Sequence, residues 1–471
     1  MLWPTKLILA ASLSGLNASD NAPTLAVVPS QPPVGRRVLI PTWELVVPVL
    51  SDSTPILEQN GPDSVVLMTE ASESPRWLGT IRVVQLNAQS FASATQSYID
   101  GYATSEKNKG HAFLVDSDRS IDGTLGTARA VWALSASPTS QLESLQDAMV
   151  GLIFVPFGEA ACILGEFKLA AALGDAKQAE CERLMLGCTG PTPESLAQER
   201  AQQLEEGGRV LEAAQGKLAE FAHTPRWYRH LRRRNDGSRQ DFGVTVTWAT
   251  YGPPPSSLAT ETERLGLHVH QQTLTGLGTQ DPYSEHFDGW VQDDLGFETF
   301  GLNWTKGESV WKSDGAASGL FERSSTNTEY ILSASDLKTA AKRQRVFNGL
   351  PTATLPMSLR MLTGKLLVQA NISDEQIRWY APMLSSENVA LSARRDQVKA
   401  FEKGTRVTWT PRQGEPATVD EFDGTGVLQR RVFPDGSEMV LTDYGSLVQA
   451  WRVAGLPTEL LQEGKSRYVK P

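Results

Sequence analysis

The stretch VLQRRVFPDGSEMVLTD, residues 427–443, decides the fold expected for the second half of the chain. It predicts two short strands around residues 434–437, because Asp-Gly supplies the positive φ that a tight hairpin turn needs. An earlier stretch repeats this pattern, with strands at residues 227–233 and 241–250 on either side of the Asn-Asp-Gly-Ser sequence at residues 235–238. The two hairpins predict an antiparallel sheet.

Further strands are expected between the two hairpins, because short runs rich in β-branched and aromatic residues alternate there with turn residues. These runs occupy residues 267–274, 286–292, 297–304, 319–323, 328–332, 376–381, 406–410 and 417–422. One helix is expected at residues 351–367, where four leucines recur at helical spacing. They are Leu355, Leu359, Leu362 and Leu366. The sequence therefore predicts a curved antiparallel β domain over residues 225–445 with a helix that covers one face, and a C-terminal tail over residues 446–471.

This order of strands with one leucine-rich helix resembles the LolA-like half-barrel of lipoprotein carriers and of many secreted bacterial proteins. The best local match is the sequence DGTGV at residues 423–427, followed by the turn at residues 434–437. The resemblance spans residues 226–445 and implies a concave sheet that holds a lipid-like ligand.

The first half of the chain predicts strands, an amphipathic helix, more strands and a final helix. The strands are expected at residues 37–50, 63–70, 76–86, 110–116, 126–135, 149–156 and 160–169. The helices are expected at residues 90–104 and 175–186. This order over residues 37–188, with the sequence AACILGEF at residues 160–167 in its last hairpin, resembles the PsbP/Mog1-like α/β sandwich. The resemblance implies a binding module rather than an enzyme, and the expected fold class of the chain is α+β.

Residues 189–224 predict a helical connector between the two domains. Thr192 is suited to cap a helix and Pro193 to occupy its first position. Leucines then recur at seven-residue spacing, which is typical of a coiled-coil dimer. They are Leu204, Leu211 and Leu218. Because glycines at residues 207–208 interrupt this pattern, we expect instead a helix or helical hairpin that lies against its own domains, with few contacts crossing the connector.

The N-terminus is typical of a signal peptide over residues 1–18. It has one early charge at Lys6, an apolar stretch over residues 7–16, and a small residue, Ala18, suited to cleavage by a signal peptidase. A buried first strand is the alternative. The apolar stretch is too short to span a membrane, and a linker is expected over residues 19–36. The protein is therefore predicted to be periplasmic or secreted, with no transmembrane segment.

Composition and motifs limit the function. The formal net charge of −10 argues against a nucleic-acid partner, because phosphate binding needs a positive surface. The sequence holds no Walker loop, no G-x-S-x-G, no H-E-x-x-H and no C-x-x-C, so no cofactor is expected. Three cysteines, Cys162, Cys181 and Cys188, allow at most one disulfide. We expect a non-enzymatic binding or scaffold protein for an apolar or lipid-like ligand or a protein partner.

A metal-dependent enzyme is the alternative function. His268 and His270 lie two residues apart on a strand and so point to the same side of the sheet. A third ligand would come from His286 or Asp288 on the following strand. A turn near Thr279 would set His270 opposite residue 289 and His286 opposite residue 273, so the three histidines are not expected to converge.

A basic cluster at residues 226–234 is one candidate for ligand binding. Its arginines include Arg229, Arg232 and Arg233, and guanidinium groups pair well with an anionic headgroup or an acidic partner. We prefer the alternative, in which the arginines protect an edge strand against aggregation.

An aromatic strand face is the other candidate. Phe300, Leu302 and Trp304 alternate onto one side of a strand. They would line an apolar pocket if the half-barrel is open, or form its core if the sheet is filled. We prefer the core.

Overall fold

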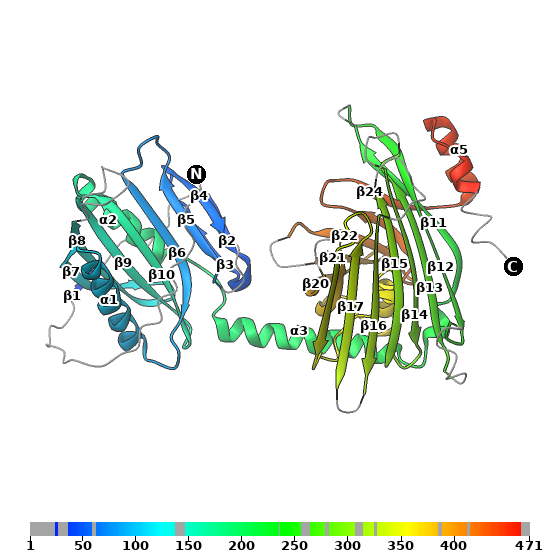
Figure 1. The fold of residues 1–471 in the computed structure, drawn as a ribbon, viewed down its shortest axis with the longest axis horizontal. Coiled ribbons are helices and arrows are strands. Elements are labelled where there is room, and N and C mark those ends of the chain that lie inside the picture. Colours follow the sequence, from blue (N-terminus) through cyan, green and yellow to red (C-terminus); the bar gives the residue numbers. More distant parts are fainter. Residues whose placement is uncertain are drawn as a thin grey trace. The chain divides into compact units, whose positions relative to one another are not determined.

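The computed structural model describes residues 24–26, 36–58, 63–136, 147–234, 236–255, 264–277, 282–306, 314–324, 327–384, 389–411 and 415–462. The chain divides into two compact units, Met1–Glu199 and Arg200–Pro471. Antiparallel sheets dominate both units and helices are few, so the chain belongs to the α+β class (Figure 1). The predicted signal peptide at residues 1–18 lies outside the described residues.

The first unit is built on a sheet whose described strands follow the order β1-β7-β8-β9-β10-β6-β5-β4. Their bounds are Thr24–Ala26 (β1), Ser53–Glu58 (β4), Val65–Glu70 (β5), Trp77–Gln85 (β6), Ala112–Gly123 (β7), Gly126–Ala136 (β8), Asp147–Phe157 (β9) and Ala161–Ala170 (β10). Strand β1 comes from the predicted linker and pairs in parallel with β7, and every other pair is antiparallel. A separate two-stranded sheet joins Arg37–Ile40 (β2) to Leu45–Pro48 (β3).

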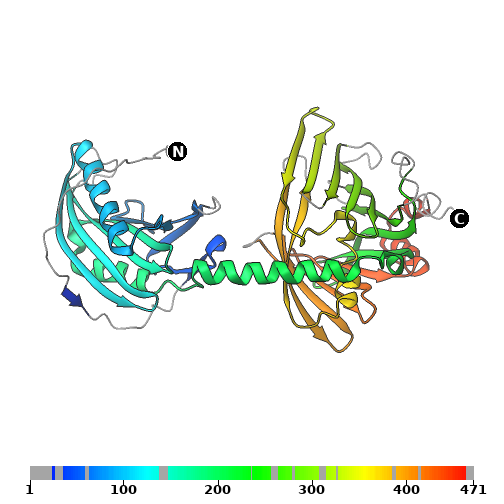
Figure 2. The same cartoon turned by 90° about the horizontal axis from the view of Figure 1, so that it is seen from below.

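Two helices cover opposite faces of this sheet (Figures 1 and 2). Helix α1 (Phe91–Asn108) begins after Ser90, whose side chain accepts a hydrogen bond from the Ser93 amide, and packs Ile99 against Phe154 and neighbouring residues. Helix α2 (Gly174–Leu186) packs Leu184 against the residues of the other face. Both faces of the sheet are buried, which explains the nearly continuous apolar sequence of β9 and β10.

The second unit contains one large sheet, with described strands in the order β18-β17-β16-β15-β14-β13-β12-β11-β24-β23-β22-β21-β20-β19. Their bounds are His223–Arg233 (β11), Arg239–Gly252 (β12), Gly266–Thr275 (β13), Tyr283–Gln292 (β14), Phe297–Lys306 (β15), Gly315–Arg323 (β16), Thr328–Asp336 (β17), Lys342–Asn348 (β18), Gln376–Leu384 (β19), Val389–Phe401 (β20), Gly404–Thr410 (β21), Thr418–Asp423 (β22), Leu428–Val432 (β23) and Glu438–Thr442 (β24). All these pairs are antiparallel.

The sheet is curved, as expected, and strands β17 and β18 contact β20 near its other edge (Figure 2). Strand β11 lies in the middle, because it pairs with β12 on one side and with β24 on the other. This pairing places the two hairpins predicted from sequence next to each other. The arginines of β11 therefore do not protect an edge of the folded sheet, and that interpretation is wrong.

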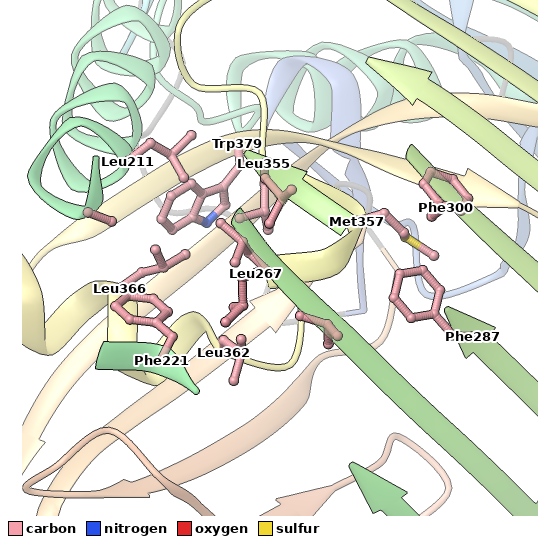
Figure 3. Packing of buried hydrophobic residues seen from close by; sticks show 14 of the residues in the cluster. Leu211, Phe221, Leu267, Phe287, Phe300, Leu355, Met357, Leu362, Leu366 and Trp379 are labelled. Atoms are coloured by element: carbon pink, nitrogen blue, oxygen red, sulfur yellow. The ribbon is translucent and has the colours of Figure 1, made fainter. Parts of the chain in front are cut away.

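Helices fill the concave side of this sheet. They are the part of α3 (Pro193–Ala214) from Arg200 onward, the 3₁₀ turns η5 (Leu218–Phe221) and η7 (Met357–Leu359), and α4 (Thr363–Gln369). Figure 3 shows side chains of α3, η5 and α4, among them Leu211, Phe221 and Leu366, grouped around Trp379 of β19. The single helix predicted at residues 351–367 is thus two short pieces, η7 and α4, and its leucines are core residues.

The glycines at residues 207–208 let α3 lie directly on the sheet. A Cβ added at Gly207 would stand 2.3 Å from the carbonyl oxygen of Arg378, and one at Gly208 would stand 2.7 Å from Oγ1 of Thr352. The side chain of Gln203 also donates a hydrogen bond to Gln376. The glycine pair is therefore a site of close packing, and this part of the connector belongs to the core of the second unit.

Most of helix α5 (Tyr444–Ala454) lies in the segment expected as a tail. The Asp443 side chain caps its start by accepting a hydrogen bond from the Ser446 amide, and Gly455 ends it in the left-handed conformation. Trp451 is fully buried in a second apolar cluster that includes Trp227 of β11. None of the described helices is long and apolar enough to cross a membrane.

Candidate functional site

The three predicted residues of the aromatic face lie in the core. Phe300, Leu302 and Trp304 on β15 are 4%, 4% and 7% exposed. The Phe300 ring lies 5.7 Å from Phe287 and 6.5 Å from Tyr330, centre to centre. None of the three lines either of the cavities described below.

A cavity of about 190 Å³ remains on the concave side, between the segment before α4 and strands β19 to β21. We call it the slot. It is lined by Leu355, Pro356, Met357, Arg360, Ala381, Pro382, Met383, Ser392, Arg394, Trp409 and Pro411. Three of these residues are prolines, whose rings are rigid and carry no backbone N–H. The slot is therefore a mostly apolar space with stiff walls.

Buried ion pairs hold one wall of the slot in place. Arg394 donates two hydrogen bonds to Asp396, at 2.7 and 2.8 Å, and Arg431 donates two to Asp420, at 2.6 and 2.7 Å. The Trp409 indole N–H donates to Asp420 at 3.0 Å, and the guanidinium of Arg394 lies 4.3 Å above the Trp409 ring. Both carboxylates are fully buried, where an unpaired charge is very unfavourable. Trp409 is thus fixed by contacts with two oppositely charged groups.

The other charged wall of the slot is also neutralised. Arg360 donates a hydrogen bond to Glu285 at 2.8 Å, and its guanidinium lies 5.4 Å from the centre of the Phe287 ring. Tyr283 donates a second hydrogen bond to Glu285, at 2.8 Å. Since both slot arginines are paired with carboxylates, the slot suits an uncharged apolar group.

A larger cavity of about 610 Å³ lies between the ends of the two hairpins. We call it the arginine pocket. It is lined by Leu231, Arg232, Arg233, Gly237, Arg239, Arg430, Asp435, Gly436, Ser437 and Glu438. Two of the three predicted arginines, Arg232 and Arg233, thus line a cavity. The third, Arg229, does not, and instead donates two hydrogen bonds to Asp241, at 2.8 and 2.7 Å.

The carboxylates of the arginine pocket are engaged. Glu438 accepts a hydrogen bond from Arg430 at 3.0 Å and lies 3.0 Å from Arg239. The hydrogen bond from Arg430 outweighs the opposing effect of burial, so the pKa of Glu438 is lowered and the carboxylate is ionised at neutral pH. Asp435 accepts hydrogen bonds from the amide and hydroxyl of Ser437 inside its own turn.

The histidine face differs from the expectation. His270 pairs with Asp288 rather than with residue 289, so His270, Asp288 and His286 share one side of the sheet. Asp288 accepts hydrogen bonds from Nδ1 of His270 and, at 3.1 Å, from Nε2 of His286. Burial alone would raise the pKa of Asp288, but these two hydrogen bonds lower it well below its ordinary value. The expected register is therefore wrong by one residue, and His270 and His286 meet at Asp288, although the three histidines together do not converge.

His268, by contrast, stands apart from this group. Its Nε2 hydrogen-bonds to the Pro253 carbonyl oxygen at 2.6 Å, and its ring lies 6.4 Å from that of Trp290. Within the described ranges, no three His, Cys, Asp or Glu side chains are arranged to hold a metal ion. The three cysteines are free and buried.

Comparisons with known proteins do not assign the chain to a family. No family model matches the chain, and no curated protein matches it. Among solved structures, a match is found to a β-barrel-like protein of the domain of unknown function DUF1849 from Brucella abortus, with a TM-score of 0.33 and 10% sequence identity. That alignment covers 46% of this chain and 95% of the Brucella protein. The PsbP/Mog1-like and LolA-like resemblances are not confirmed by these matches.

Proposed function

We propose that the protein is an exported, non-enzymatic binding protein whose second unit takes an apolar or lipid-like ligand into the slot. The observation that carries the proposal is a cavity of about 190 Å³ on the concave side of a sheet that is otherwise filled by helices and core side chains. Export to the periplasm or outside the cell rests on the signal-like sequence of residues 1–18.

The size of the slot limits the ligand. An apolar cavity of about 150 Å³ in another protein stays dry and binds benzene. The slot is similar in volume, and rigid walls such as Pro356, Pro382 and Pro411 reduce the entropy lost on binding. It therefore suits one ring or the end of one chain, with the rest of a larger ligand outside.

The fold resemblances add finer proposals. A LolA-like role for the second unit is supported by its curved antiparallel sheet with helices on the concave side. A PsbP/Mog1-like role for the first unit, as a module that binds a protein partner, is supported by a sheet covered by α1 and α2 on opposite faces. The metal-dependent alternative is less favoured, because His268 is bonded to the Pro253 carbonyl and His270 to Asp288.

A slot-filling variant tests the proposal. Ala381 lines the slot, and Ala400 is an exposed residue of β20 outside it. With the neutral fluorescent probe N-phenyl-1-naphthylamine, Ala381→Leu should weaken binding by about tenfold or more, because the added carbons compete for the same small space. Ala400→Leu should bind the probe as the parent protein does. Equal binding by all three proteins would rule out the slot as the site.

A further inference from the structure

The arginine pocket exists only because β11 pairs with β24, which brings together two turns that lie far apart in the sequence. Glycine stands in each turn with a positive φ, of 82° at Gly237 and 79° at Gly436. A Cβ added at either position would meet no other atom within 4 Å. The rim of the pocket is therefore open, and a ligand can reach the charged groups from outside.

Positive charge is in excess in this pocket. Four arginines line it, from β11, β12 and β23, against two carboxylates. Glu438 is shared between Arg239 and Arg430, and Arg430 also lies 3.6 Å from Glu421, which is outside the lining. Like charges held close together repel each other, so an anion bound among them is stabilised.

Two arginines of the lining form no ion pair with a carboxylate in the described part of the chain, although the charge of Arg233 also acts on Glu438. Arg232 donates one hydrogen bond to the side-chain oxygen of Gln240, at 3.3 Å. Arg233 is exposed, and within the described part of the chain its side chain makes no hydrogen bond or ion pair. Neighbouring residues of a strand point to opposite faces, so Arg233 shares the face of Arg239 and Glu438 and is available to an anion there, whereas Arg232 lies on the other face with Gln240.

We propose that the arginine pocket binds a phosphate group that is carried by a larger polar molecule. Guanidinium forks match phosphate oxygens in pairs, and the oxygens of a phosphate group can accept hydrogen bonds from several arginines at once. The volume of about 610 Å³ exceeds the needs of a bare phosphate, so it leaves room for a substituent. Soluble phosphate esters and lipid headgroups share this chemistry, and the test below distinguishes them. This inference is independent of the slot.

The test uses the full chain and calorimetric titration with pyrophosphate and glycerol 3-phosphate. We expect both to bind, with affinity that falls as salt is raised. Arg233→Gln should weaken binding by about tenfold, which corresponds to about 1.4 kcal/mol. The matched control is Arg345→Gln, which changes an exposed arginine of β18 outside the pocket. A second variant, Glu438→Gln, should have the opposite effect on affinity. It removes the carboxylate that pairs with Arg239 and Arg430, so phosphate should bind more tightly.

Vesicle flotation separates the two sources of phosphate. Binding of the protein to phosphatidylglycerol vesicles but not to pyrophosphate or glycerol 3-phosphate would identify a lipid headgroup, and the reverse would identify a soluble phosphate compound. Either result, with loss in Arg233→Gln and not in Arg345→Gln, supports the proposal. It is overturned if no phosphate compound binds, if the two arginine variants weaken binding equally, or if only poly-glutamate binds, which would indicate an acidic protein partner.

Discussion

Gly207 of α3 lies against the backbone of Arg378, so closely that a Cβ on Gly207 would stand 2.3 Å from the Arg378 carbonyl oxygen. Gly207→Ala should therefore lower the free energy of unfolding by about 1–3 kcal/mol, the usual cost of overpacking, although alanine favours the helix. The control is Gly101→Ala in α1, where an added Cβ meets nothing within 4 Å. There alanine should raise stability by about 0.5–1 kcal/mol. Denaturant titration measures both, and the same sign for the two variants would contradict the packing argument.

Removing a partner from a buried ion pair should be costly. Asp420→Asn removes the negative charge and one of the two acceptor oxygens that pair with the Arg431 guanidinium. We expect the free energy of unfolding to fall by about 3–5 kcal/mol. Glu421→Gln, at the next position, breaks a pair with Arg406, whose side chain is half exposed, and should cost about 1 kcal/mol or less. Thermal or chemical unfolding distinguishes the two variants. If Asp420→Asn were as stable as the parent protein, the buried ion pair would contribute little to stability.

A variant of Trp304 tests whether the concave side of the sheet is closely packed at β15. Because the indole is buried and in contact with the backbone region of Gly315, Trp304→Ala should destabilise the fold by about 3–5 kcal/mol. Leu320→Ala, which truncates a more exposed side chain on β16, should change stability by about 0.5 kcal/mol or less. A stable Trp304→Ala variant that loses the neutral probe would instead identify an open pocket at this position.

His230 should make stability depend on pH. Burial, with a smaller effect of the Arg431 charge, lowers its pKa to about 4, whereas a histidine in the unfolded chain titrates near pH 6.5. Between these two pKa values the histidine is protonated in the unfolded state but not in the folded state. Its contribution to stability is therefore fully present above about pH 6.5 and is lost as the pH falls toward 4. His223 is partly buried, and the loss of hydration lowers its pKa to about 4 as well.

Unfolding midpoints measured from pH 7 to pH 4 check this dependence. His230→Asn should reduce the loss of stability between pH 7 and pH 4 by up to about 3 kcal/mol, which is the free-energy equivalent of the shift in pKa. The loss of stability caused by His223 should remain. His268→Asn changes a histidine on the other side of the sheet and should leave the profile as it is. An unchanged profile in His230→Asn would show that this histidine is not the titrating group.

The local features of this fold could be predicted from the sequence. The turns at residues 235–238 and 434–437 and the stripe of α1 depend on neighbouring residues only, and the structure has both hairpins and the helix. Helix α5 could have been found in the same way, since Asp443 and Gly455 are typical cap residues at its two ends. The prediction of a tail over residues 446–471 does not include this helix.

The non-local features could not be predicted. Nothing in the sequence near β11 indicates that it pairs with β24, and the arginine pocket depends on that pairing. The register of β13 and β14 differs by one residue from the expected one, which is enough to move Asp288 onto the face of His270. The ion pairs Arg394–Asp396 and Arg431–Asp420 could be predicted only in part. In the sequence they are visible as oppositely charged residues on strands that are otherwise apolar on one side.

The pairing of β11 with β24 also orders the folding of the second unit in time. During synthesis β11 is the first described strand of the second unit to emerge, yet one of its two sides has no partner until β24, the last described strand, is made. Such long-range closure is slow, and an unpaired strand is open to pairing with other chains in the interval.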